Sequence, residues 1–443
     1  MKRIKKFVLK KCDISQNVER QNPYEEKLQQ YKWRLISDGF YEKKWQSIKS
    51  GYTKIHLYGI GMEAVGESMP RLMRMVCDLY ENKLSSLELH VVLPLFPDTY
   101  KGGVFNDRVL DLFNQYLYII NDSNIDFWIY VLRNHKKEVN LNSFNRYKFR
   151  EAGYIVTKMG IPIIELSSDL LAEAEKKFAK FSIEGEFVCI HAREENEKKA
   201  NYGEDYARET AISNCDINSF QQACLYLQQE GIKIVRMGKF EDNECTIPGV
   251  IDYANRYYDE LMDFYLLQKC KFMVASNSGL WVLPGCFGRP CIIVNAVGMN
   301  TGWESSVFME QNMYLPKKFW SEEEGRCLNL YEVLDIVNEC HVYYSNFKEK
   351  KVLLIDNTEE EIYEAVKEMN LRLDGVWKES PEETECMRKY RIIIESWYKS
   401  HEYAKERKKY GMKGYTINES KISWSYLKNN LYLLDVADVL LRD

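Results

Sequence analysis

The sequence EFVCIHARE, residues 186–194, decides the fold of the second half of this chain. Its apolar run from Phe187 to Ile190 shows no alternation with polar residues, which is typical of a parallel strand buried on both faces. Polar chemistry begins where this strand ends, at His191 and Arg193. Ligands of open α/β sheets bind at the carboxyl ends of the strands, so we predict that this point is the functional centre.

Apolar strands and amphipathic helices continue to alternate after residue 194. Asp216 is expected to cap the first of these helices, and Gly231 is expected to end it. This order predicts a doubly wound parallel sheet. The first expected strand begins at residue 187, and the later ones span 233–237, 250–254, 271–276 and 291–295. The expected helices span 217–230 and 258–270.

The first half of the chain predicts a similar plan. Residues 54–58 lead into Gly59-Ile60-Gly61 and then into an apolar helical pattern, which is the opening of a Rossmann-like unit. The expected strands span 54–58, 87–96, 126–132 and 154–164, and the expected helices span 22–50, 65–84, 107–120 and 167–181.

The predicted fold class is therefore α/β, with two Rossmann-like doubly wound domains. Helical extensions are expected at both ends. Thr358 and Glu361 form a capping-box signature for a helix over 359–373, and residues 380–443 are expected to be wholly helical. The expected boundaries are 1–50 for the N-terminal extension, 51–182 and 183–350 for the two domains, and 351–443 for the C-terminal helical region.

Composition limits the classes of function. A chain of 443 residues suits two domains, and a net charge of -5 argues against nucleic acid as a partner. The twelve cysteines include no Cys-x-x-Cys pair, so we interpret them as reduced core residues of a cytoplasmic protein, with zinc or disulfides as the alternative.

Two further features bear on localisation. No stretch approaches the roughly 20 apolar residues of a membrane span. Met1–Lys11 is rich in lysine around a few apolar residues, and we favour a solvated basic terminus. The alternative is peripheral contact with an anionic bilayer at the inner face of the membrane.

Arg193 and His191 are the first candidates for chemistry. A guanidinium at a buried strand end is suited to hold a diphosphate, because it is permanently charged and donates two hydrogen bonds to phosphate oxygens. The alternative for Arg193 is an ion pair with a nearby glutamate. His191 is a candidate general base or phosphate ligand, or a hydrogen-bonded structural residue.

Three neighbouring strand ends supply the other candidates. Ser276, Asn277, Ser278 and Gly279 are expected to open a helix whose amides bind phosphate. Arg236 adds positive charge, and Gly238 lets a base or ribose approach the backbone. Asp252 and Tyr253 are expected to contact the base or ribose, or Asp252 to bond its own turn.

Glu63 and Glu67 follow the glycine turn of the first domain and are candidates to deprotonate an acceptor hydroxyl. The glycines there do not form the full Gly-x-Gly-x-x-Gly pattern, so we predict no dinucleotide site. The sequence has no Walker loop, His-Glu-x-x-His or Asp-x-Asp motif. We therefore expect a reaction that needs neither a metal nor another cofactor.

Six motifs in this order resemble a family of bacterial glycosyltransferases that is distantly similar to fucosyltransferase-like enzymes of the GT-B fold. They cover most of the chain from 186 to about 375. The motifs are VCIHAR at 188–193, NCDI at 214–217, IVRMG at 234–238, IDYA at 251–254, SNSGL at 276–280 and DNTEEEI at 356–362.

The resemblance implies that the two domains face each other across a cleft, as in the GT-B fold, with a nucleotide-sugar donor held mainly by the C-terminal domain and an acceptor held by the N-terminal one. It places Asn214 and Asp216 in the donor site and implies that Arg193 and the serine turn stabilise the leaving diphosphate. The expected acceptor is a hydroxyl of a glycan, a lipid-linked glycan or a protein in surface-glycan biosynthesis, and inversion is the expected outcome.

One departure from the family pattern bears on whether the chain is an active enzyme, and other enzyme classes of the same fold are also alternatives. Glu194 stands where the family tends to have Asp, and its Tyr-Arg-Asn run is broken between Tyr206 and Asn214. The alternatives to a hexosyl-type glycosyltransferase are a nucleotide-sugar epimerase, a polyol-phosphate transferase, or a catalytically silent nucleotide-binding subunit of a glycan assembly complex.

Overall fold

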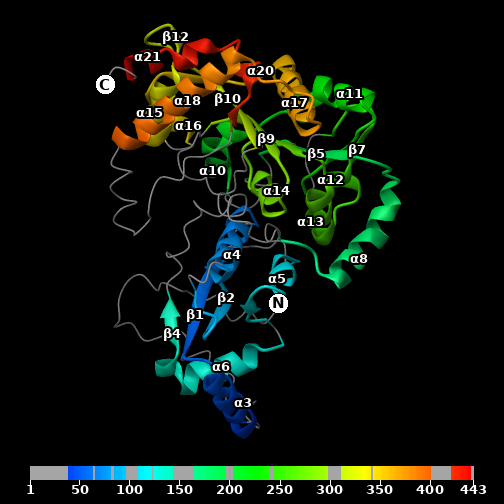
Figure 1. Cartoon of the computed structure of the whole chain (residues 1–443), viewed down its shortest axis with the longest axis vertical. Coiled ribbons are helices and arrows are strands. Elements are labelled where there is room, and N and C mark those ends of the chain that lie inside the picture. Colours follow the sequence, from blue (N-terminus) through cyan, green and yellow to red (C-terminus); the bar gives the residue numbers. More distant parts are fainter. Residues whose placement is uncertain are drawn as a thin grey trace. The chain divides into compact units, whose positions relative to one another are not determined.

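A computed structural model of the chain describes residues 38–62, 65–80, 84–95, 108–121, 123–142, 164–195, 199, 203–239, 244–297, 311–340, 343–400 and 421–440 (Figure 1). The chain divides into two compact units, Met1–Lys148 and Phe149–Asp443. The predictions for the basic terminus, for Glu63 and for most of the 154–164 strand fall outside the described residues. The expected domain boundaries and the expected cleft stay predictions.

The first unit contains a four-stranded parallel sheet of order β3-β2-β1-β4. Its two long strands pair from Lys54↔Glu88 to Gly61↔Leu95, which confirms the strands expected there. The bounds are β1 Lys54–Gly61, β2 Glu88–Leu95, β3 Tyr118–Ile119, β4 Asn140–Asn142, α3 Asp38–Gly51, α4 Val65–Tyr80, α5 Arg108–Phe113, α6 Ile125–Asn134 and the 3₁₀ turn η2 Lys136–Glu138.

The expected strand over 126–132 is wrong, because these residues form α6. Ile125, Trp128 and Val131 are buried at a spacing of three residues, which places them on one helical face. Aromatic and branched residues favour strands only weakly, and packing decides between the two structures. The helix expected over 107–120 is shorter than predicted, since α5 ends at Phe113 and β3 follows it.

The second unit contains a seven-stranded parallel sheet of order β14-β10-β9-β8-β5-β6-β7. Its strands are β5 Phe187–His191, β6 Lys233–Arg236, β7 Val250–Asp252, β8 Met273–Ala275, β9 Cys291–Ala296, β10 Met313–Pro316 and β14 Lys421–Ile422. A small antiparallel sheet, β12-β11-β13, is built from β11 Lys318–Ser321, β12 Arg326–Cys327 and β13 Val352–Ile355. The predicted α/β class with parallel sheets is thereby confirmed.

Helices cover both faces of the seven-stranded sheet, with α11 and α17 on one face and α13 and α14 on the other (Figure 1). The helices of this unit are α8 Ser168–Phe178, α10 Glu204–Glu209, α11 Gln221–Gln229, α12 Tyr253–Arg256, α13 Glu260–Lys269, α14 Leu283–Cys286, α15 Leu330–Cys340, α16 Tyr344–Glu349, α17 Glu359–Leu373, α18 Pro381–Ser400, α20 Trp424–Leu427 and α21 Ala437–Leu440. The 3₁₀ turns are η5 Ala179–Phe181, η6 Ala211–Ser213, η7 Ile217–Phe220, η8 Leu280–Val282 and η10 Leu431–Leu434.

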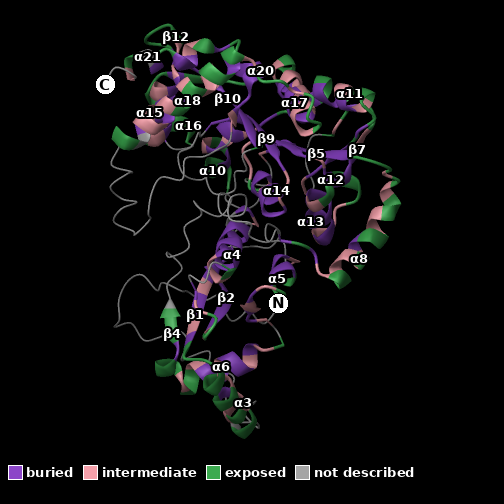
Figure 2. Ribbon diagram, viewed as in Figure 1, coloured by how far each residue is buried: buried purple, intermediate pink, exposed green. Residues whose placement is uncertain are grey.

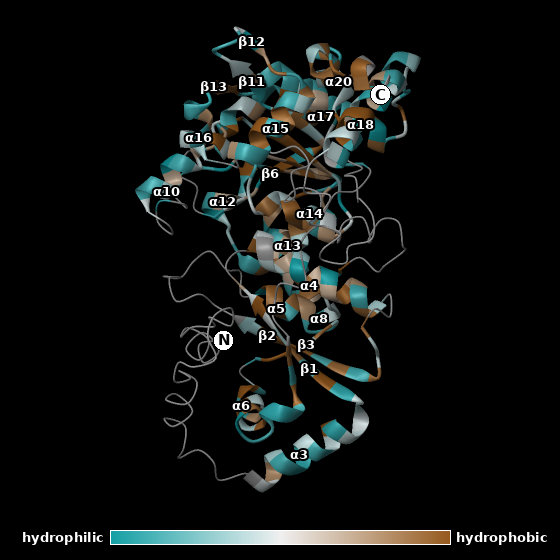
Figure 3. Ribbon diagram, turned by 90° about the vertical axis from the view of Figure 1, so that its left-hand side faces the viewer, coloured by the Kyte–Doolittle hydropathy of each residue, from teal (hydrophilic) through white to brown (hydrophobic). Residues whose placement is uncertain are grey.

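The core of the second unit lies along the middle of this sheet. Every residue of β5, β8 and β9 is buried, as predicted for parallel strands covered on both faces (Figure 2). Short helices show their environment in their composition: α14 is mainly apolar, whereas α10 is mainly hydrophilic (Figure 3). The described cysteines are all free and mostly buried, and burial raises the pKa of Cys189.

The C-terminal region combines helices with one more strand. The capping box of Thr358 and Glu361 is confirmed at the start of α17. The expectation that 380–443 is wholly helical is wrong, because β14 pairs with β10 at the sheet edge. Glu368, which is buried in α17, accepts hydrogen bonds from Ser423 Oγ and the amide of Ser425 and so fixes this strand and the start of α20.

Candidate functional site

Four strand ends bring the predicted site residues of the second unit to one edge of one sheet. The register pairs Ile190 with Arg236, Arg236 with Asp252, and His191 with Ala275, directly before Ser276. Because all these strands are parallel, their carboxyl ends lie on the same side. The structure therefore places His191, Arg193, Arg236, Asp252 and Ser276 along one edge, as the sequence predicted.

Arg193 is fixed at both its backbone and its side chain. Its amide donates to Ser276 Oγ over 2.8 Å, and the Ser276 amide donates to the His191 carbonyl over 3.1 Å. Its guanidinium donates to the carbonyl and the hydroxyl of Thr210, over 2.5 and 2.8 Å. Only 7% of Arg193 is exposed, so this charge is held in place before any ligand arrives. Thr210 gave no signal in the sequence, because it lies 17 residues after Arg193, between α10 and η6.

One ring nitrogen of His191 contacts a backbone carbonyl. Nδ1 lies 3.0 Å from the carbonyl oxygen of Met237, which only accepts, so Nδ1 carries the proton. In the neutral ring the lone pair is then on Nε2, the nitrogen that can accept a proton. The residue is 7% exposed, at the junction of β5 and β6. This arrangement fits a general base and also fits a structural residue, the two roles predicted for it.

Arg236 lies between two buried carboxylates. Its Nη2 is 3.0 Å from Glu194 Oε1, and its Nη1 is 3.4 Å from Asp252 Oδ2. The three side chains are 1%, 5% and 6% exposed, respectively for Arg236, Glu194 and Asp252. The expectation that Arg236 adds positive charge to the edge is corrected, because the triad has two negative groups and one positive. Glu194, noted as a departure from the family pattern, is the ion-pair partner of Arg236.

Three side-chain oxygens at this edge are buried without a hydrogen-bond partner among the described residues: Asn214 Oδ1, Asp252 Oδ1 and Asn277 Oδ1. A buried polar atom in this state needs an explanation, because an unmade hydrogen bond costs about 1–3 kcal/mol. Hydroxyl groups of a bound molecule are suitable donors for all three. The sequence predicts a donor-site role for Asp252 and Asn277, and the family resemblance implies one for Asn214.

The serine turn differs from its prediction in one respect. Residues 280–286 form the 3₁₀ turn η8 and the four-residue α14, which contains Pro284, instead of a long helix. So short an element has little macrodipole, so no helix dipole is expected to attract a phosphate here. Ser276 is fully buried and positions Arg193, while Ser278 Oγ accepts from the amide of Leu280. Gly279 is exposed.

The remaining candidates have defined local roles. Tyr253 is buried, and its hydroxyl contacts Asp259 and Asp263, so we drop its expected contact with a base or ribose. Asp216 caps η7 through the amide of Asn218, as predicted for a cap. Gly238, after β6, has a φ of 140°, a conformation that favours glycine. Glu67 lies in α4, and its side chain is outside the described residues.

The far side of the same edge, at β9 and β10, holds residues that sequence reasoning missed. Asn295 and Asn357 bond each other's amides through their side-chain oxygens, both over 2.6 Å, and Asn357 Nδ2 also donates to the Pro316 carbonyl. Asn295 Nδ2 lies 3.1 Å from the sulfur of Cys215, whose pKa is raised by burial. Lys317 follows β10 and pairs with Asp356 over 2.5 Å. The sequence signals were the strand-like run 313–316 and the DNTEEEI motif.

Within the described ranges, no group of three or more His, Cys, Asp or Glu side chains is arranged to hold a metal ion. The described helices also include none with the length and apolar character needed to cross a membrane. The absence of a cofactor and the cytoplasmic or peripheral location stay predictions.

Neither a protein-family model nor a curated protein sequence matches this chain. Solved structures do. ADP-heptose LPS heptosyltransferase II of E. coli is 12% identical, with 67% of this chain and 98% of that chain covered and a TM-score of 0.35. The iron-containing dodecameric glycosyltransferase TibC of enterotoxigenic E. coli is 10% identical, with 58% and 63% covered and a TM-score of 0.35.

A third structure, UDP-GlcNAc 2-epimerase of Neisseria meningitidis bound to UDP-GlcNAc, is 12% identical, with 72% of this chain and 100% of that chain covered and a TM-score of 0.30. All three scores lie below 0.5, so these likenesses carry no argument about the reaction of this chain. None of the three is a fucosyltransferase-like enzyme, and that part of the expected resemblance stays a prediction.

Proposed function

We propose that this chain is a glycosyltransferase that moves a sugar from a nucleoside diphosphate donor to a hydroxyl of a glycan, lipid-linked glycan or protein. The donor occupies the carboxyl edge of the seven-stranded sheet. One observation carries the proposal: Asn214, Asp252 and Asn277 each have a buried acceptor oxygen without a partner among the described residues, at the edge where Arg193 is fixed. Ribose and sugar hydroxyls supply the missing donors.

Arg193 has the electrostatic role in this proposal. As the bond between the anomeric carbon and the diphosphate breaks, negative charge grows on the leaving oxygen. A cation already held by Thr210 and by the Ser276 contact needs no reorganisation, and a well-placed donor of this kind contributes about 3 kcal/mol. Because Arg236 is neutralised by Glu194 and Asp252, we assign it to structure.

The transfer needs a base as well as a leaving group. The acceptor oxygen attacks the anomeric carbon, its proton passes to the base, and the nucleoside diphosphate leaves with the electrons of the broken bond. His191 is the candidate in the second unit, because its Nδ1 contact with Met237 leaves Nε2 as the basic atom. Glu63 and Glu67 are the candidates of the first unit. Attack opposite the leaving group predicts inversion.

The test pairs a ligand panel with one substitution. Wild-type protein is screened by thermal shift against GDP, UDP, CDP, CMP, dTDP and their sugars, and the best donor is then assayed for transfer with and without EDTA. Asn277→Ala removes an unpartnered oxygen, so we expect unchanged stability without ligand and about tenfold weaker donor binding. Asn429→Ala, an exposed amide on the C-terminal segment, is the matched control.

The outcomes separate this proposal from its rivals. Absence of binding and of donor hydrolysis across the whole panel would contradict it. Release of nucleotide without a transferred sugar would identify an epimerase, and a transferred polyol phosphate would identify the third enzyme class. Nucleotide binding that depends on Asn277, without turnover, would identify a silent binding subunit. Inhibition by EDTA would reject the metal-free form alone.

A further inference from the structure

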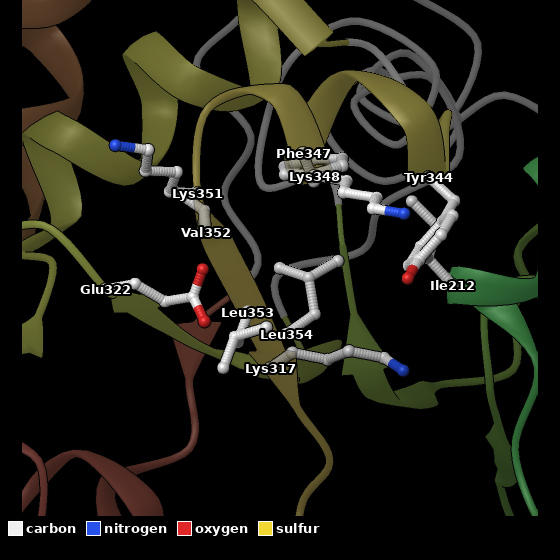
Figure 4. A pocket seen from close by; sticks show the side chains of 10 residues that line it. All are labelled: Ile212, Lys317, Glu322, Tyr344, Phe347, Lys348, Lys351, Val352, Leu353 and Leu354. Carbon is white, nitrogen blue, oxygen red and sulfur yellow. The ribbon is translucent and has the colours of Figure 1, made fainter.

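A cavity of about 200 Å³ lies beside β10, among residues that the proposed reaction does not use. It is lined by Lys317, which follows β10, by Tyr344, Phe347 and Lys348 of α16, and by Leu354 of β13 (Figure 4). In the view of Figure 4, the polar ends of Lys317, Tyr344 and Lys348 project to one side of the cavity, and Glu322 and Lys351 lie on the other side. Isoleucine, valine, leucine and phenylalanine side chains form the apolar part of the lining.

Lys317 gives this cavity its chemical character. Its side chain is 5% exposed, whereas that of its partner Asp356 is 54% exposed. A buried ammonium is costly, and an ion pair compensates that cost well only when both members are held in good geometry. A hydrated carboxylate is a weak partner by this measure. A buried cation beside a cavity and a poorly buried partner together favour an anionic ligand.

The second cation is more accessible. Lys348 is exposed, and it lines the cavity from the helix that also carries Tyr344. Two ammonium groups and a phenolic hydroxyl match the charge and the acceptor oxygens of a phosphate group, which carries about −1.5 to −2 at pH 7. The volume leaves room for part of the molecule that bears the phosphate, against Phe347 and Leu354.

The cavity is also linked to the edge described above. Ile212, another lining residue, lies in η6 directly after Thr210, which holds the guanidinium of Arg193. We propose that this cavity binds a phosphate group through Lys317, Lys348 and Tyr344. The inference does not require sugar transfer. The phosphate belongs either to the nucleotide donor or to a second, phosphorylated molecule such as the acceptor.

The experiment is calorimetric titration of the full chain with inorganic phosphate and, separately, with UDP, at constant ionic strength. Lys348→Met removes one ammonium and is expected to weaken phosphate binding about tenfold, while Tyr344→Phe weakens it by a smaller factor. The matched control is Lys350→Met. Lys350 is two residues away, exposed, and paired with Glu339 instead of lining the cavity. Its substitution is expected to change the affinity less than twofold.

Equal affinity of Lys348→Met and Lys350→Met for phosphate would overturn the inference, as would a wild-type protein that binds no phosphate. A parallel loss of UDP affinity in Lys348→Met supports it and identifies the phosphate as that of the nucleotide. A loss for inorganic phosphate alone supports it and identifies a second phosphorylated molecule. No arm uses transfer, so failure of the proposed reaction would leave this test intact.

Discussion

Buried charges at two ends of the same sheet edge differ in how far their partners are buried. At the ends of β5, β6 and β7, Arg236 and both of its carboxylate partners are buried. At the end of β10, Lys317 is buried but its partner Asp356 is mostly exposed. In the first group each charge depends on the others, because removing one leaves the rest uncompensated in a medium of low polarity. The exposure of the partner therefore separates a structural charge from one that is available to a ligand.

The largest expected effect on stability is at the buried triad of Arg236, Glu194 and Asp252. Arg236→Met leaves Glu194 and Asp252 buried without a cation, and we expect it to lower the free energy of unfolding by about 3–5 kcal/mol in urea titrations. Arg208→Met, which breaks an exposed pair with Asp205, is the control and should cost less than about 0.5 kcal/mol.

If Arg236→Met does not fold, Glu194→Gln provides the second measurement. It removes the excess negative charge and keeps an acceptor for Arg236, so a cost below about 1 kcal/mol is expected. Equal costs for Arg236→Met and Arg208→Met would show that the triad is not the dependent unit described above.

A pH experiment tests another buried acid of this unit, Asp263 in α13. Burial raises the pKa of this carboxyl to about 8, so the folded protein keeps a proton that the unfolded chain loses near its ordinary pKa of 3.8. The folded state therefore binds more protons between these values, and stability falls as pH rises from about 4 to 8, by at most about 1.4 kcal/mol per pH unit. Asp263→Asn should remove this slope. Parallel stability curves for the two proteins would contradict the assignment.

An intermediate effect on stability is expected at the paired side chains of Asn295 and Asn357. Asn357→Ala leaves the amide of Asn295 and the carbonyl of Pro316 buried without their partner, and we expect a loss of about 2 kcal/mol in the free energy of unfolding. Asn357→Asp keeps the acceptor and loses the donor, so it should cost less if the Asn295 amide is the main contact. An equal cost for the two variants would assign the main role to the Pro316 contact, which both of them lose.

The smallest effect on stability is expected at Lys317, whose partner Asp356 is exposed. Lys317→Met leaves Asp356 hydrated, and the methionine replaces the apolar stem of the lysine, so unfolding should change by less than about 1 kcal/mol. The same variant should bind phosphate more weakly. A loss of stability as large as that of Arg236→Met would remove the distinction between the two sides.

Much of the second unit could be predicted from the sequence, because its strands are unbroken apolar runs that end in polar residues. The end of β5 at His191 and Arg193 shows this most clearly. The roles of Arg193 and Arg236 could not be predicted in the same way. They depend on Thr210, Glu194 and Asp252, whose approach to these guanidinium groups is a property of the folded chain.

In the first unit, the helix α6 was missed for another reason. Its apolar run satisfies both a strand and a helix, and only the burial of Ile125, Trp128 and Val131 on one face separates the two. Lys317 was missed because it follows a short strand, β10. Its proposed role depends on a cavity that is formed by three separate segments of the chain. Such a cavity cannot be predicted from the charge and spacing of residues along the sequence.

The edge strand β14 has a consequence for biosynthesis. Its residues Lys421 and Ile422 pair with Met313 and Tyr314, and Glu368 holds the turn that follows. A ribosome adds about 5–20 residues per second, so this last strand emerges well after its partner β10. Until then the edge of β10 is unpaired, and such an edge can pair with another chain. During synthesis there is therefore a period in which the edge of β10 can pair with another chain. This period ends when β14 pairs with β10.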